Sequence, residues 1–230
     1  MRQVVLDTET TGLDVARGDR VIEIGCVELA NRGLTGRRFH CYLNPEREVE
    51  AGALAIHGID DEFLRDKPKF AEIADEFVEF VSGAELVIHN AAFDIGFLDH
   101  ELGLAGRPQV AELARRVIDT LKLARDHHPG RKNSLAALCE RYSIDHSQRT
   151  LHGALLDAEL LADVYLAMTR GQESLLMEFA TAEGADAVPA ERPPLEILRA
   201  TEDELRAHER VLAEIERESK GRCLWLRAEG

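Results

Sequence analysis

Two acidic residues stand two positions apart near the start of the chain, in a segment whose alternation of Val and Leu predicts a strand over residues 2–9. Side chains two apart on a strand project from one face, so Asp7 and Glu9 would lie close together. Carboxylates at short range repel each other unless a proton or a cation intervenes. The pair therefore indicates a cation site, unless the strand end is exposed and both acids are simply solvated.

Two further acids stand at the starts of predicted helices. Asp94 ends the segment H-N-A-A-F-D and falls in the first turn of one helix. Asp157 follows His152 by five residues and enters another, whose opposite face is apolar. Taken singly, each acid is explained by its favourable position at a helix N-terminus. His152, taken singly, is explained as an ordinary histidine in a surface loop. Four carboxylates at one site, in contrast, suit hard divalent cations such as Mg²⁺ or Mn²⁺ better than zinc.

The three motifs follow one another in a specific order: D-T-E-T-T-G from Asp7, H-N-A-A-F-D from His89 and H-G-A-L-L-D-A from His152. This set resembles the DEDD superfamily of 3′→5′ exonucleases, in the branch whose general base is a histidine five residues before the last aspartate. The resemblance covers residues 1 to about 170 and implies an RNase H-like fold. It implies a catalytic set of five residues, four of which hold two divalent cations, Mg²⁺ or Mn²⁺: the metal ligands Asp7, Glu9, Asp94 and Asp157, and the general base His152.

In such an enzyme a water activated by the metal attacks the terminal phosphodiester, His152 takes its proton, and a nucleoside 5′-monophosphate leaves. A histidine suits this role because its unperturbed pKa lies near the working pH. The resemblance also implies a set of residues that hold the terminal nucleotide: Thr10, Thr11, Gly12, His57, Asn90 and Phe93. Phe93 has an alternative place in the apolar core. Basic residues that flank the site in sequence could meet phosphates: Arg131, Lys132 and Arg149.

Longer segments narrow the resemblance. Residues 61–100 and 133–165, together with the C-L-W sequence at 223–225, resemble the epsilon subunits of bacterial DNA polymerase III. This resemblance implies a DNA-binding exonuclease that proofreads during DNA replication, located in the cytoplasm with the nucleoid-associated replisome, and an optional small accessory subunit. Two alternatives remain: a stand-alone RNA or DNA-repair exonuclease of the same superfamily, and a catalytically inactive assembly subunit. The C-terminal sequence favours the epsilon family, since stand-alone relatives are not expected to share it.

The elements that must position these residues follow from the apolar pattern. Strands are predicted over 2–9, 20–30 and 36–43 with short connections, which favours an antiparallel meander. Further along, short strands at 85–89 and 115–118 alternate with predicted helices: 70–80, 92–102, 134–142 and 155–168. Alternation of this kind predicts an α/β fold with a mixed sheet. Together with the resemblance, it predicts a mixed five-stranded sheet flanked by helices, plus a C-terminal tail with a short helix.

The domain organisation is predicted from a change in composition near residue 181. Residues 1–180 would form the exonuclease domain, and its segment 172–179 (Q-E-S-L-L-M-E-F) resembles peptides that dock on the sliding clamp, although an apolar helix end is the alternative. Three prolines mark 181–200 as a flexible linker. Within the tail 201–230, Thr201 and Glu204 predict the start of a helix that would end at Gly221. The resemblance implies that this tail, with Trp225 as an anchor, binds the polymerase catalytic (alpha) subunit.

The overall composition is typical of a globular protein, but its negative charge is unusual for a protein that binds nucleic acid. The chain has 230 residues, 45% of them hydrophobic, and it carries 28 Lys and Arg against 43 Asp and Glu, a net charge of −15. No apolar run approaches the length of a membrane helix, the four cysteines form no C-x-x-C pair, and the N-terminal segment has no signal-peptide pattern, so a cytoplasmic protein without disulfides is expected. A strong negative charge argues at first sight against a nucleic-acid partner. Two bound divalent cations would reduce it to about −11 where the phosphate must lie, so we expect weak DNA binding without metal and partner.

Overall fold

The computed structural model describes residues 2–147, 149, 151–170, 200–219 and 225. The chain separates into two units, Met1–Phe179 and Ala180–Gly230. The segment 172–179 and all but the last residue of the predicted linker 181–200 lie outside the described residues. In the described parts of the chain, no helix is long and apolar enough to cross a bilayer.

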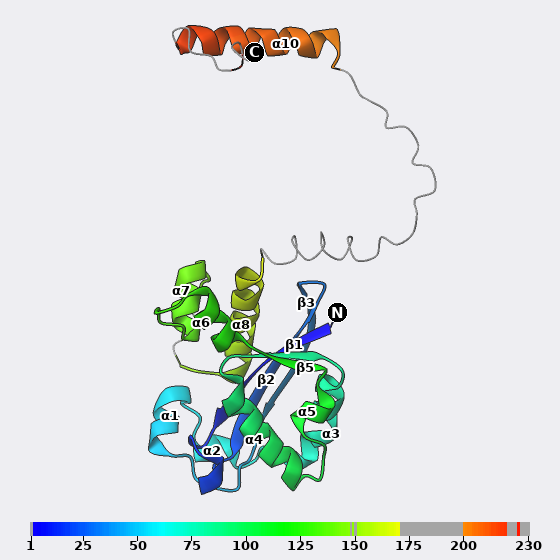
Figure 1. The fold of residues 1–230 in the computed structure, drawn as a ribbon. Helices are drawn as coiled ribbons and strands as arrows, with labels where there is room; N and C mark the ends of the chain where they lie inside the picture. The colour runs from blue at the N-terminus through cyan, green and yellow to red at the C-terminus, as the bar shows by residue number, and fades with distance from the viewer. Residues whose placement is uncertain (1, 148, 150, 171–199, 220–224, 226–230) are drawn as a thin grey trace, which may run out of the picture. The chain divides into compact units, whose positions relative to one another are not determined.

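The first unit is built on a five-stranded mixed sheet, as predicted (Figure 1). Its strands are β1 (Arg2–Thr10), β2 (Val21–Ala30), β3 (Gly33–Tyr42), β4 (Glu85–Ile88) and β5 (Arg116–Asp119). The order is β3-β2-β1-β4-β5, with β1–β2 and β2–β3 antiparallel and β1–β4 and β4–β5 parallel. The antiparallel half is the predicted meander, and the parallel half contains the strands that alternate with helices.

Helices cover both faces of this sheet: α3 and α5 lie on one side and α6, α7 and α8 on the other (Figure 1). The helices in the described residues of this unit are α1 (Ala51–His57), α2 (Asp61–Leu64), α3 (Phe70–Val81), α4 (Ala91–Leu104), α5 (Val110–Leu113), α6 (Thr120–His127), α7 (Leu135–Tyr142) and α8 (Ala154–Met168), with a 3-10 turn at Val15–Arg17. The four helices predicted within this unit are confirmed to within two residues at each end. Four further short helices, α1, α2, α5 and α6, were not predicted from the sequence.

Two apolar cores lie on opposite faces of β1. Val4 and Leu6 belong to the core that includes Phe70, Phe77 and Phe80 of α3, whereas Val5 belongs to the core formed with α7 and α8. Because strand side chains alternate between faces, Asp7 and Glu9 continue the face of Val5. Both acids are thus directed to the side of the sheet on which α8 packs.

The second unit contains α10 (Glu202–Glu218), which starts as predicted with a reciprocal hydrogen-bonded cap between Thr201 and Glu204. The helix ends at Glu218 rather than at the predicted Gly221, because Ser219 closes the last turn by donating its N–H to the carbonyl of Ile215. Its apolar residues are exposed, Leu205 at 52% and Ile215 at 40%, and Trp225 is 77% exposed. This unit therefore presents apolar side chains to solvent.

Candidate active site

The end of β1 carries the first two acids. The parallel pairing of β1 with β4 stops at Leu6, so the following residues extend past the end of β4. Asp7 and Glu9 pair instead with Gly25 and Glu23 of β2. Glu9 is only 8% exposed, and Asp7 is half-buried. The sheet therefore presents two neighbouring carboxylates at the carboxyl end of a central strand, where α/β sheets commonly place their sites.

Asp94 reaches the same place from α4. The chain turns from β4 into this helix at Asn90, which has a left-handed backbone with φ 67°. Asp94 is 3% exposed, and its Oδ1 accepts hydrogen bonds from the N–H of Thr8 at 3.1 Å and from the Thr8 hydroxyl at 2.7 Å. The first turn of α4 is thereby fastened to β1 between the two strand acids.

The start of α8 is positioned by β2. Glu23, 2% exposed, accepts a hydrogen bond from the N–H of Ala154 at 3.1 Å and contacts Nε2 of His40 at 2.7 Å. At Gly25 a Cβ would lie 2.2 Å from backbone atoms of Ala154 and Leu155, so only glycine permits this approach. Neither Glu23 nor Gly25 was predicted to have this role. The one available signal was an acid and a glycine inside an otherwise apolar strand.

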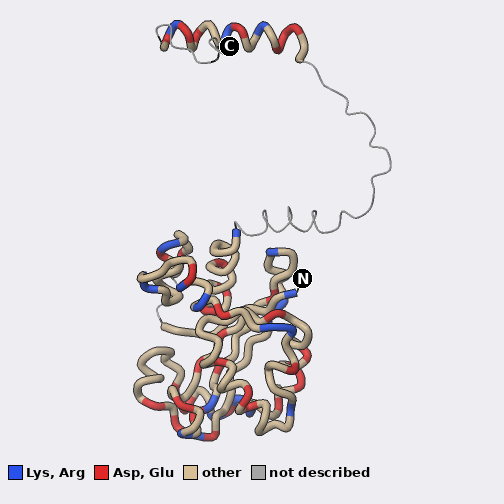
Figure 2. Tube along the Cα trace, viewed as in Figure 1, with Lys and Arg blue, Asp and Glu red and all other residues tan. Residues whose placement is uncertain are grey.

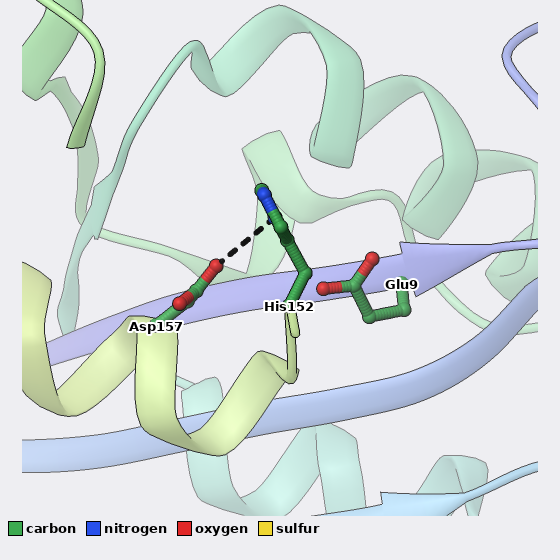
Figure 3. A group of neighbouring side chains, drawn as sticks. All are labelled: Glu9, His152 and Asp157. Atoms are coloured by element: carbon green, nitrogen blue, oxygen red, sulfur yellow. Dashed lines mark ion pairs between the residues drawn. The ribbon is translucent and has the colours of Figure 1, made fainter. Parts of the chain in front are cut away.

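These elements bring together Glu9, His152 and Asp157, each of which offers a ligand atom within 4.8 Å of the others (Figure 3). Nδ1 of His152 lies 3.4 Å from Oδ2 of Asp157, which is itself 3% exposed. Asp7 and Asp94 line the same cavity of about 1110 Å³, although they lie outside this closest group. All five residues predicted to be catalytic are therefore gathered at one cavity.

The acids influence one another strongly. Burial raises the pKa of Glu9 to about 8, and the charge of Asp157 adds to the effect. Burial likewise raises the pKa of Asp94 to about 7, while its hydrogen bonds from Thr8 oppose the shift. The pKa of Asp7 lies well above its usual value because of burial and the charges of Asp94, Asp157 and Glu9. Carboxyl groups that hold protons at neutral pH for this reason are favourable sites for a cation.

The side chain of His152 is partly exposed at the edge of the acidic cluster. Its side chain is 46% exposed, and burial together with the charge of Arg149 lowers its pKa, while Asp157 opposes the shift. The ring is therefore neutral near pH 7. Its position directly before α8 keeps it beside Asp157 and Glu9 (Figure 3).

Four of the six predicted nucleotide-binding residues line the cavity: Thr10, Gly12, His57 and Phe93. Thr11 is fully buried and its hydroxyl donates to Asp19 at 3.1 Å, so its side chain serves the loop. Asn90 is exposed and is not part of the cavity lining. Phe93 has both of the roles considered for it, since it lines the cavity and also packs against Phe97 with ring centroids 4.9 Å apart.

His57 carries a buried polar atom that points to a ligand. The residue is 5% exposed, its Nδ1 accepts from the N–H of Ile59 at 3.0 Å, and burial lowers its pKa, so the proton lies on Nε2. This Nε2 has no hydrogen-bond partner among the described residues, although the carbonyl of Thr10 is close enough to favour the protonated ring. A buried donor without an acceptor is costly. A ligand in the cavity that offers an acceptor would remove that cost.

The donor set fits divalent metal ions. Carboxylate oxygens dominate it, burial raises the pKa values of Asp7, Glu9 and Asp94, and no cysteine belongs to the group of ligand atoms found in the described chain. Hard cations with oxygen ligands suit such a site.

Comparison with known proteins places the fold in a class. The chain matches the RNase_T exonuclease family over residues 4–165. Among solved structures, exonuclease X in complex with 5′ overhanging duplex DNA is similar, with a TM-score of 0.58 and 26% identity over 74% of this chain and 93% of that one. The structure of Escherichia coli exonuclease I with a dT13 oligonucleotide, at 19% identity and a TM-score of 0.65 over 78% of this chain and 43% of that one, shares the fold. The predicted RNase H-like exonuclease fold is confirmed.

Full-length relatives narrow the class. The chain is 52% identical over 237 residues to the DNA polymerase III subunit epsilon of Escherichia coli (strain K12), with 97% of each chain covered. It is 54% identical over 175 residues to the subunit of the same name from Rickettsia felis, with 76% of each covered. The chain belongs to the family of DNA polymerase III epsilon subunits, as the sequence motifs predicted.

Proposed function

We propose that the cavity binds the 3′ end of DNA and that the acidic cluster within it is a centre for two divalent cations, Mg²⁺ or Mn²⁺. As an epsilon-family member, the chain is a proofreading 3′→5′ exonuclease associated with DNA polymerase III. The gathering of Glu9, His152 and Asp157 within 4.8 Å carries the proposal, because it joins metal-ligand oxygens to a neutral imidazole.

Each residue has a distinct role in the proposed reaction. Asp7, Glu9, Asp94 and Asp157 would hold the ions. When bound, such ions lower the pKa of water and stabilise negative charge on the phosphate and leaving oxygens. His152 accepts the proton of the attacking water, for which its lowered pKa and half-exposed ring suit it. The mispaired terminal nucleotide leaves as a 5′-monophosphate.

Substrate placement rests on the cavity wall. The unsatisfied Nε2–H of His57 would donate to an acceptor of the terminal nucleotide, and the ring of Phe93 would contact its base or sugar. Thr10 and Gly12 would supply close backbone contact. Thr11 stabilises this loop by donating its hydroxyl hydrogen bond to Asp19, and Asn90 forms the turn into α4. His57→Ala should raise KM for a mispaired 3′ end more than it lowers kcat. A change confined to kcat would contradict a binding role.

The central test separates the base from the ligands. His152→Ala should retain Mn²⁺ binding and lose roughly 10²–10⁴ in rate, the usual contribution of a positioned base. Asp7→Ala should weaken Mn²⁺ binding itself. Calorimetric titration with Mn²⁺ distinguishes the two, and equal loss of metal affinity in both variants would refute the assignment. Comparison of mispaired and paired primer ends, alone and with the polymerase, measures the proofreading function.

The tail is proposed to join the enzyme to its polymerase. Its observed support is the exposed apolar residues of α10 and the exposed Trp225, which suit a partner anchor. The segment 172–179 is proposed to bind the sliding clamp. Truncation at residue 186 should leave exonuclease activity intact and abolish association with the catalytic (alpha) subunit, whereas deletion of 172–179 should weaken pull-down by the clamp. Co-purification of the truncated chain with the alpha subunit would contradict the first assignment, and unchanged clamp binding the second.

Family membership also supports a cytoplasmic location, since a replication subunit works at the chromosome. An association with the nucleoid-bound replisome, and with a small accessory subunit, is part of this proposal. Imaging of a fluorescent fusion alongside a replisome marker tests the location, and separate distributions would contradict it.

A further inference from the structure

Arg149 places a positive charge inside the acidic cluster. Its guanidinium pairs with both oxygens of Asp157, Nε with Oδ1 at 2.5 Å and Nη2 with Oδ2 at 2.7 Å. The Arg149 side chain is 13% exposed and that of Asp157 is 4% exposed, so the pair is largely shielded from water. Two-pronged pairs of this kind are among the strongest charge-assisted hydrogen bonds.

The same guanidinium also contacts His152. Its Nη2 lies 3.0 Å from Nδ1 and 3.2 Å from Nε2 of the ring, and Nδ1 lies 3.4 Å from Oδ2 of Asp157. Arg149 therefore engages one proposed metal ligand and the proposed base together. Asp157 and His152 also belong, with Glu9, to the group of closest ligand atoms.

A divalent cation held by Glu9 and Asp157 would meet this guanidinium at the same carboxylate oxygens. Two positive charges at such short range repel each other, and shielding from water increases the repulsion. Metal ion and guanidinium are thus competitors for Asp157. The fork needs both oxygens, so even coordination through one of them breaks part of it.

We propose that Arg149 is the internal counter-ion of the acidic cluster, and that a divalent cation enters the site by displacing its guanidinium from Asp157. The inference rests on the proposed metal centre. The positive charge of Arg149 would offset the repulsion among the four neighbouring acids, so that they can lie together in the folded domain. The displacement also links metal entry to the release of His152, because one guanidinium contacts both residues.

The test compares Mn²⁺ binding by isothermal titration calorimetry in the full chain and its variants. Arg149→Gln should bind Mn²⁺ about tenfold or more tightly than the natural chain, since the competitor is gone, and Arg149→Lys, which keeps the charge without the fork, should fall between them. Arg131→Gln is the matched control. Arg131 lines the same cavity but is exposed, and it makes no ion pair within the described chain. Equal or weaker Mn²⁺ affinity in Arg149→Gln would overturn the inference.

A second measurement follows the guanidinium directly. The Nε–H resonance of Arg149, assigned by its absence in Arg149→Lys, should shift on saturation with diamagnetic Mg²⁺, and an unmoved resonance at saturation would overturn displacement. If Arg149→Gln folds only when Mn²⁺ is present, the counter-ion role is supported, and Arg149→Lys then decides the competition. The two proposals fail differently. If Asp157→Asn binds Mn²⁺ as tightly as the natural chain, the metal centre is refuted. If the natural chain binds Mn²⁺ and Arg149→Gln binds it with the same affinity, only the role of Arg149 is refuted.

Discussion

Binding of divalent metal should release protons from the acidic cluster at neutral pH. Burial raises the pKa of Glu9 to about 8, with the charge of Asp157 adding to the shift, and burial raises the pKa of Asp94 to about 7. At pH 7 the first is then about 90% protonated and the second about half protonated. A metal ion needs both as carboxylates, so these two groups alone release about 1.4 protons. The pKa of Asp7 is raised as well, by burial and by the charges of Asp94, Asp157 and Glu9.

The same protonation sets the pH dependence of metal affinity. Between pH 7 and pH 8 the proton competition at Glu9 and Asp94 falls by about a factor of ten, equivalent to about 1.4 kcal/mol of binding free energy. His152 does not contribute, because its lowered pKa leaves it neutral throughout this range. Affinity should therefore rise with pH, opposite to the trend expected if a cationic group assisted metal binding.

Calorimetry in two buffers of different ionisation enthalpy measures both quantities. The apparent binding enthalpy should differ between buffers in proportion to the protons released. Glu9→Gln should bind metal more weakly and lose about 0.9 of the released protons, whereas Glu62→Gln, an exposed acid on α2, should match the natural chain. A binding enthalpy that is the same in both buffers at pH 7, or an affinity that is flat from pH 7 to pH 8, would refute the claim that the acids hold protons.

Two other predictions concern stability. Because the folded-state pKa of Glu9 lies above its usual 4.5, the folded chain binds more protons than the unfolded one, so without divalent ions the free energy of unfolding should fall as pH rises from about 4.5 to 8. Thermal melts should show this decline in the natural chain and a flatter profile in Glu9→Gln; equal slopes would contradict it. Gly25→Ala should push α8 away from β2 and cost about 1–3 kcal/mol with a loss of activity, while Gly96→Ala, which has open space, should be near neutral. Urea unfolding with a nuclease assay measures both, and an active, stable Gly25→Ala protein would show that the close approach is dispensable.

The local sequence pattern was sufficient to predict which strand or helix carries each acid of the proposed site. The two-residue spacing of Asp7 and Glu9 needs only the alternation of a strand, and Asp94 and Asp157 need only the start of a helix. What the pattern could not supply was the set of contacts between distant segments. Glu23 supports Ala154 across 131 residues of sequence, and no local signal connects them.

The short helix α1 was missed for a different physical reason. Ile56 of α1, for example, is 47% exposed because it lines the cavity and does not pack in a core. A helix that serves a cavity has no buried stripe to reveal its period. Arg149 is a related case: the sequence marks it as one of three basic residues near the site, and only the folded chain shows its fork on Asp157.

The net charge of −15 is compatible with a nucleic-acid substrate once its distribution is considered. Acidic and basic positions are mixed along the first unit (Figure 2), so the charge is not one repulsive field over the whole surface. Within the cavity, the acids are compensated by retained protons and by Arg149, both of which are exchangeable for divalent cations under the proposals above. Each cation that enters then brings positive charge to the place where a terminal phosphate must lie. The affinity of the isolated chain for a single-stranded 3′ end should therefore rise with Mg²⁺ or Mn²⁺ and lose this dependence in Glu9→Gln. If the DNA affinity does not change with divalent ions, the residues that bind DNA lie elsewhere on the protein.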